Sequence, residues 1–178
     1  MMSTGINYRE TYFEFSELTK VQGEPTCESL YLLLRNELKA NAQSVYSNLS
    51  NGAHGHLALI LSDAQYALVT PTAFVCPEHP GTLVIPDGTT AAMPTVLRDA
   101  HHEQLRLFCE VQGVEKALIQ QIVQAVGAPY LSSIRDRVTS SLRGTVFTIF
   151  DNLQTVYGRV SPQMLEDREQ ELRSSASD

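Results

Sequence analysis

The longest regular segment of the sequence spans residues 95–126 and has the period of an α-helix. Its apolar residues recur every three or four positions, as on the buried side of an amphipathic helix, and most polar residues between them are helix formers. The repeat places Leu118 and Ile122 in the core. We expect Gly113 to divide the segment into two helices and Gly127 to end it as a left-handed cap. A mainly α fold is therefore predicted.

Helical spacing also predicts shorter helices on both sides of this segment. They span residues 25–46, 63–69, 130–138, 142–157 and 162–173. Ser62 is a suitable N-cap for the second of them, and the fourth is expected to bury Phe150 and Leu153. Residues 71–88 are rich in Pro and Gly, which predicts a loop or a small hairpin. The prediction is a helical bundle of about five to seven helices.

The chain is predicted to contain one domain with two less regular ends. Residues 1–23 mix aromatic and acidic side chains without a period, so we expect a loosely ordered N-terminal arm. Residues 24–160 form the predicted helical domain. Residues 161–178 form a charged C-terminal helix with a frayed tail, because few apolar side chains are present there to pack.

Charge and hydropathy exclude two kinds of partner. With 13 Lys plus Arg against 20 Asp plus Glu the net charge is −7, so nucleic acid is an unlikely partner. The arginines of 131–160 are interpreted as a solvated helix face rather than an RNA contact. No stretch approaches the ~18 apolar residues of a membrane span, and the first residues do not resemble a signal peptide. We expect a cytoplasmic protein without a membrane contact.

The sequence has no recognisable catalytic or nucleotide-binding motif. It contains neither Gly-x-Ser-x-Gly nor a glycine-rich phosphate loop, so we expect no enzymatic activity and no cofactor. The one metal-binding alternative is a zinc site. Its four ligands would be His54, His56, Cys76 and His79. Zinc sites normally have two closely spaced ligand pairs, and this spacing differs, so loop histidines without metal are the favoured interpretation.

Four sequence runs resemble the Gag region of copia-type retrotransposons. These runs are 52–59 (GAHGHLAL), 86–93 (PDGTTAAM), 114–123 (VEKALIQQIV) and 153–165 (LQTVYGRVSPQML). The last run contains the Leu-x-x-x-Tyr-Gly segment that precedes a charged helix in those proteins. The similarity covers about residues 17–173 and concerns fold-type motifs rather than catalytic ones.

The resemblance implies a capsid-type structural domain that associates with itself or with other Gag-type chains. Such chains normally continue beyond the charged helix, so we expect a truncated form in which an apolar face has lost its cover. Phe147, Phe150 and Tyr157 are the predicted interaction residues of that face, and the loop of residues 71–93 is a possible contact surface. The alternative is a small host adaptor domain that binds a partner helix.

Overall fold

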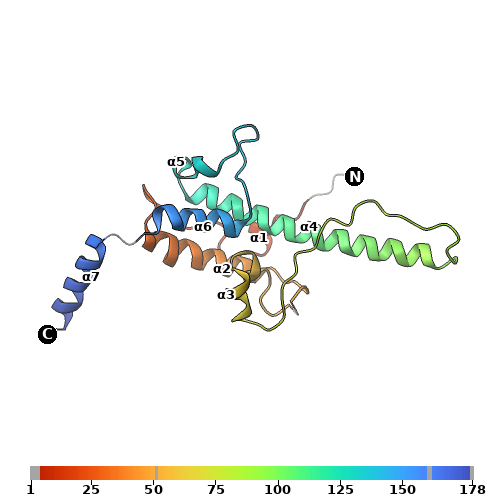
Figure 1. Cartoon of the computed structure of the whole chain (residues 1–178), viewed down its shortest axis with the longest axis horizontal. Coiled ribbons are helices and arrows are strands. Elements are labelled where there is room, and N and C mark those ends of the chain that lie inside the picture. Colours follow the sequence, from red (N-terminus) through yellow and green to blue (C-terminus); the bar gives the residue numbers. More distant parts are fainter. Residues whose placement is uncertain (1–4, 51, 160–161, 177–178) are drawn as a thin grey trace.

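The computed structural model describes residues 5–50, 52–159 and 162–176, and it is mainly helical, as predicted (Figure 1). Seven α-helices and no strand occur among these residues. They are α1 (Tyr8–Thr11), α2 (Arg35–Ser44), α3 (Asp63–Ala67), α4 (Met93–Ala125), α5 (Ala128–Leu131), α6 (Val146–Tyr157) and α7 (Pro162–Ser175). One π-helical segment, η1 (Ser29–Leu34), and two 3₁₀ turns, η2 (Leu57–Leu59) and η3 (Ser132–Ile134), complete the list.

The core forms where α2 and α6 pack against α4. All buried residues of α4 lie between Val111 and Ala125, on the side that faces these helices. The four residues predicted for the core are confirmed there: Leu118, Ile122 and Leu153 are completely buried and Phe150 is nearly so. We call residues 111–125 the inner half of α4 and residues 93–110 the outer half.

Two predictions about glycines in this region are wrong. Gly113 does not divide α4, which runs through it without a break, and its missing side chain leaves room for the Tyr8 ring. A Cβ at Gly113 would lie 2.7 Å from Cε2 of Tyr8. Gly127 is not a left-handed cap, since its φ is −59° and it precedes α5 directly. The chain leaves α4 through Val126 in an extended conformation instead.

The N-terminal segment packs on the helices, which corrects the expectation of a loosely ordered arm. Phe13 and Leu18 are buried in the core. Two buried amides hold the backbone between them: Asn41 Oδ1 accepts from the Phe15 N–H at 2.8 Å, and Gln121 Nε2 donates to the Phe15 carbonyl at 2.8 Å. Asn41 Nδ2 also donates to Gln121 Oε1 at 2.8 Å. This closed network satisfies the buried polar groups, so the segment docks without an orphaned backbone group at Phe15.

The outer half of α4 extends away from the other helices, and the loop of residues 71–92 runs beside it (Figure 1). Two contacts hold the loop to the helix. The His101 ring nitrogen Nε2 lies 2.9 Å from the Gly81 carbonyl oxygen, and the His79 ring meets Phe108 edge-on with centroids 5.0 Å apart. The loop contains no strand, so of the two predicted forms for 71–88 the structure has the loop.

Two shorter elements follow directly from local sequence. Ser62 caps α3 as predicted: its hydroxyl accepts from the Gln65 N–H, and the Gln65 side chain bonds back to the Ser62 N–H. The helix predicted for 130–138 is shorter than expected, because helical structure ends at Ile134 and a turn follows. In the described part of the chain, no helix is both long and apolar enough to cross a membrane.

Candidate interaction surfaces

A groove of about 500 Å³ lies between α3, the inner half of α4 and the start of α6. We call it the Phe147 groove. It is lined by Ala58, Leu59, Leu61, Ser62, Asp63, Cys76, Val111, Gln112, Glu115, Thr145 and Phe147. Most of these side chains are apolar, and the two ionisable side chains that carry charge at neutral pH are carboxylates. The groove therefore offers apolar contact within a negative field.

Local capping at the start of α6 positions Phe147 in this groove. Thr145 caps the helix with a hydroxyl that accepts from the Thr148 N–H. Glu115 Oε1 accepts from the Val146 N–H at 3.1 Å, which places a carboxylate at the positive end of the helix dipole. Burial raises the pKa of the nearby Cys76 thiol, and the carboxylates of Glu115 and Asp63 raise it further. The thiol is therefore neutral and adds to the apolar lining.

A second groove, of about 480 Å³, lies between α4 and the segment that follows η3. We call it the Leu142 groove. It is lined by Ile119, Gln120, Val123, Gln124, Arg135, Ser140, Ser141 and Leu142. Here the single charged lining residue is a cation, Arg135. The two grooves thus share an apolar lining and differ in the sign of their charge.

The turn that forms one wall of the Leu142 groove is held by Asp136. Its Oδ1 accepts from the N–H groups of Val138 and Thr139 at 2.8 and 2.9 Å, and its Oδ2 accepts from Arg143 at 3.0 Å. These hydrogen bonds lower the pKa of the Asp136 carboxyl, and the two from backbone N–H groups have the largest effect. Arg135 and Leu142 face each other across an antiparallel bridge. Three of the arginines predicted to lie on a solvated helix face, Arg135, Arg137 and Arg143, are therefore in this turn segment.

The structure separates the three predicted interaction residues. Phe147 lines the Phe147 groove. The prediction that Phe150 belongs to an exposed interaction face is wrong, because Phe150 packs in the core and only 4% of its surface is exposed. Tyr157 is half-buried, and its ring meets Tyr130 edge-on with centroids 5.5 Å apart. The predicted face divides because α6 turns Val146, Ile149, Phe150 and Leu153 toward the core, whereas Phe147 lies at the edge of that stripe.

The four residues of the zinc alternative are not brought together. His56 is completely buried, Cys76 lines the Phe147 groove, and His79 packs against Phe108 on the outer half of α4. His54 is half-buried in the turns before η2. In the described ranges no group of three or more His, Cys, Asp or Glu side chains is placed to hold a metal ion.

His56 has a packing environment that its sequence position did not reveal. Its Nδ1 lies 2.9 Å from the Val45 carbonyl oxygen, so Nδ1 bears the proton in the neutral ring and donates it. Its Nε2 makes no hydrogen bond and lies 3.7 Å from Glu110 Oε1. Burial lowers the pKa of His56, although the Val45 carbonyl and Glu110 act in the opposite direction. The ring also meets Phe74 edge-on, so it belongs to the core.

Exposed aliphatic side chains lie on the elements outside the core and also on the helices that form it, such as Val156 of α6 at 52%. Val75 and Val84 are exposed on the 71–92 loop, and Val96 is exposed on the outer half of α4. At the Asp136 turn, Val138 is 92% exposed. On α7, Leu165 and Leu172 are 56% and 69% exposed. Every α7 side chain whose burial is described is exposed to solvent.

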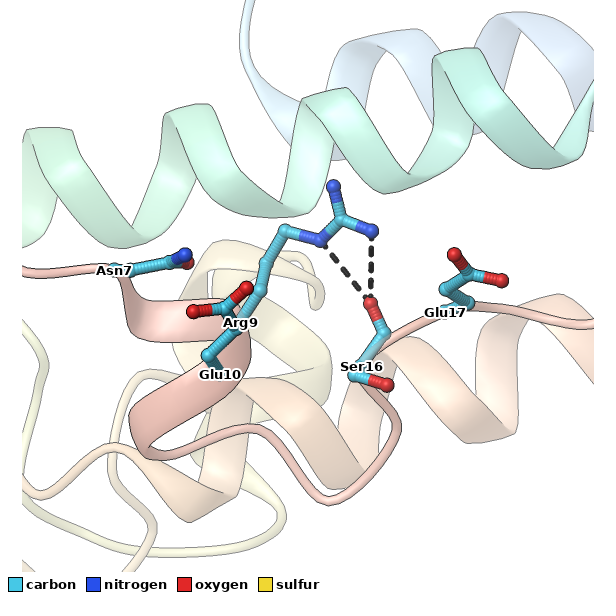
Figure 2. A pocket seen from close by; sticks show the side chains of 5 residues that line it. All are labelled: Asn7, Arg9, Glu10, Ser16 and Glu17. Atoms are coloured by element: carbon cyan, nitrogen blue, oxygen red, sulfur yellow. Dashed lines mark hydrogen bonds between the residues drawn. The ribbon is translucent and has the colours of Figure 1, made fainter.

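The N-terminal segment forms a small polar pocket of about 250 Å³ (Figure 2). Asn7, Arg9, Glu10, Ser16 and Glu17 line it. The Arg9 guanidinium spans the pocket and donates to the Ser16 carbonyl at 3.1 Å from Nε and 2.9 Å from Nη2. Arg9 therefore closes the loop between α1 and the following segment, which is a structural role.

Sequence reasoning did not identify the Leu142 groove or the amide pair that holds the N-terminal segment. The burial of Asn41 could have been predicted, since the spacing of Leu38, Ala42 and Val45 places this residue on the apolar side of its helix. The Leu142 groove gave no such signal, because one of its walls is a turn segment without a periodic pattern. Comparison with known proteins adds no assignment: no family model, no curated protein and no solved structure matches the chain.

Proposed function

We propose that this protein is a non-catalytic assembly domain of the Gag type that associates with copies of itself. The observation that supports this most directly is where its exposed aliphatic side chains lie. Val84, Val96, Val138 and Leu172 are all on elements that extend beyond the core. Exposed aliphatic side chains of this kind favour contact with another protein surface, because burying them releases water from apolar area.

The two grooves support the same proposal. Each is concave and mainly apolar, whereas the exposed aliphatic residues project from other parts of the chain. A contact between unlike surfaces of two identical chains either closes by a two-fold exchange into a dimer or repeats into rings and open assemblies. The proposed partners are further copies or other Gag-type chains in the cytoplasm, and the net charge of −7 disfavours nucleic acid.

Size-exclusion chromatography with light scattering over a range of concentrations tests this proposal. We expect the mean mass to rise with concentration and to change little with salt, since apolar contact dominates. The variant Val84→Ser/Val96→Ser removes two exposed methyl-bearing side chains and should reduce the association without lowering the thermal stability. A monomeric mass at every concentration would contradict the proposal.

The Phe147 groove favours an adaptor as the second candidate function. Its apolar lining with Asp63 and Glu115 suits one amphipathic helix that carries basic residues beside its apolar face. An adaptor would be monomeric and would bind such a helix in the groove. Titrating the protein with a fluorescent basic amphipathic peptide tests this. Phe147→Ser should abolish binding if the groove is the site.

A further inference from the structure

Helix α7 lacks the tertiary packing that normally stabilises a short helix. It has 14 residues, and all of its side chains with described burial are exposed. Isolated helices shorter than about 12–15 residues are marginal in water, and amphipathic packing usually stabilises them. A partner surface would therefore stabilise α7 as well as cover its leucines.

One face of α7 has the composition of a docking face. Leu165 and Leu172 are seven residues apart, which places them two turns apart on the same side. Glu169 lies between them, four residues after the first leucine and three before the second. This face therefore presents an acidic group between two exposed aliphatic side chains, and the Glu169 carboxylate also lies 4.0 Å from the Arg173 guanidinium of the same helix.

The Leu142 groove matches this face in both polarity and charge. Ile119, Val123 and Leu142 provide an apolar lining, and Arg135 provides a cation beside it. The Arg135 guanidinium donates to the Ser140 carbonyl, and no carboxylate lies within ion-pair distance of it among the described residues. The Phe147 groove is the poorer match, because Asp63 and Glu115 would repel Glu169.

We propose that α7 of one copy docks in the Leu142 groove of a second copy, with Glu169 paired to Arg135. This inference rests on the proposed self-association and names its contact. The occupant comes from a second copy because α7 remains uncovered within its own chain (Figure 1). A two-fold exchange covers both helices and fills both grooves in one closed dimer.

Charge reversal tests the proposed pair in the full-length chain. Arg135→Glu and Glu169→Arg should each raise the dissociation constant about tenfold, measured by sedimentation equilibrium, because each places like charges together. Arg137→Glu is the matched control on the same turn, since Arg137 is exposed and does not line the groove. Asp167→Arg is the control on α7, since it lies on the opposite side of the helix. Both controls should stay near the wild-type value.

Mixing the two reversal variants distinguishes exchange between chains from docking within one chain. An equimolar mixture should recover wild-type association, because each variant's groove then meets the opposite charge on the other variant's helix. If the mixture stays weak while the double variant Arg135→Glu/Glu169→Arg recovers, α7 docks within its own chain and the inference is wrong.

The leucines provide a test that does not depend on the turn. Arg135 also bonds to Ser140, so its reversal can disturb the turn, whereas Leu165 and Leu172 are exposed and their removal leaves the core intact. Leu165→Ser/Leu172→Ser should raise the dissociation constant at least about a hundredfold. If that variant associates like the wild type, α7 is not the contact, yet the proposed self-association stands. A monomeric wild-type protein would overturn both.

Discussion

The two halves of α4 belong to one continuous helix and have opposite environments. The inner half buries Val111, Val114, Leu118 and Ile122 against α2 and α6. In the outer half no residue is buried, and its main covering is the 71–92 loop. Both halves show the same helical period in sequence. The period therefore identifies the helix but not the depth at which each turn is buried.

The difference shows how stability is distributed along the chain. Apolar burial and dispersion contacts stabilise the inner half, while the outer half depends on helix propensity and a few loop contacts. Regions of low local stability are commonly the ones available for binding. The exposed aliphatic side chains of the outer half are consistent with that division.

The largest expected effect compares aspartate substitutions in the two halves. Ile122→Asp buries an unpaired carboxylate in the core and should lower the free energy of unfolding by more than about 4 kcal/mol, which removes the cooperative transition. Val96→Asp, at an exposed position, should change it by no more than about 0.5 kcal/mol. Thermal unfolding followed by circular dichroism measures both. Equal losses in the two variants would show that the halves do not differ.

The amide pair formed by Asn41 of α2 and Gln121 of the inner half should give the next largest loss. Asn41→Ala leaves the Phe15 N–H without its acceptor and removes a partner of Gln121, which should cost about 2–3 kcal/mol. Residues 13–21 should then exchange their amide hydrogens faster. The control is Asn36→Ala, at an exposed position of α2. It should leave the free energy of unfolding and the amide exchange of residues 13–21 nearly unchanged. Unchanged exchange in Asn41→Ala would argue that the amides do not hold the segment.

His56 contacts the end of the outer half, because its Nε2 lies 3.7 Å from Glu110 Oε1. Burial lowers its pKa in the folded state below the ordinary value of about 6.5. As the pH falls through 6.5 the unfolded chain takes up a proton at His56 while the folded chain does not, so the free energy of unfolding should fall. Urea unfolding at pH 7.5 and at successive values below 6.5 measures this. His56→Phe should flatten the profile, and His102→Phe, at an exposed position of the outer half, should not.

The smallest effect concerns Gly113, where the inner half begins. In the Tyr8→Ala background, Gly113→Ala should stabilise the protein by up to about 1 kcal/mol, because alanine is the better helix former. In the wild-type background the gain should be smaller or reversed, since the new Cβ meets the Tyr8 ring. The non-additivity of the double-mutant cycle measures this contact. Strict additivity would mean that the ring does not require the glycine.

Periodicity was sufficient to predict the longer helices α2, α4, α6 and α7 and the central core residues, but not α1 or the full extent of α4. Leu118, Ile122 and Leu153 were identified because core contacts and helix geometry impose the same spacing. The same reasoning failed for Phe150 as an interaction residue, because a helix pattern does not tell how wide its buried stripe will be. Phe147 lines a groove that the sequence did not reveal, and its role as an interaction residue stays a prediction.

The remaining differences come from contacts between segments distant in sequence. Residues 5–23 looked irregular because their order depends on Asn41 and Gln121, not on a period of their own. Gly113 looked like a helix break because the Tyr8 ring that fills its space lies about a hundred residues away. Neither partner can be recognised from local propensity.

By itself the sequence determined the helical class, the capped start of α3 and the apolar stripe of the inner half, because these follow from backbone geometry and neighbouring residues. Only the tertiary structure decided which half of α4 is buried, how the N-terminal segment docks, and that one groove is lined by Glu115 and the other by Arg135. The physical reason is that burial and local charge are sums over all surrounding segments, whereas helix formation depends mainly on neighbours within one turn.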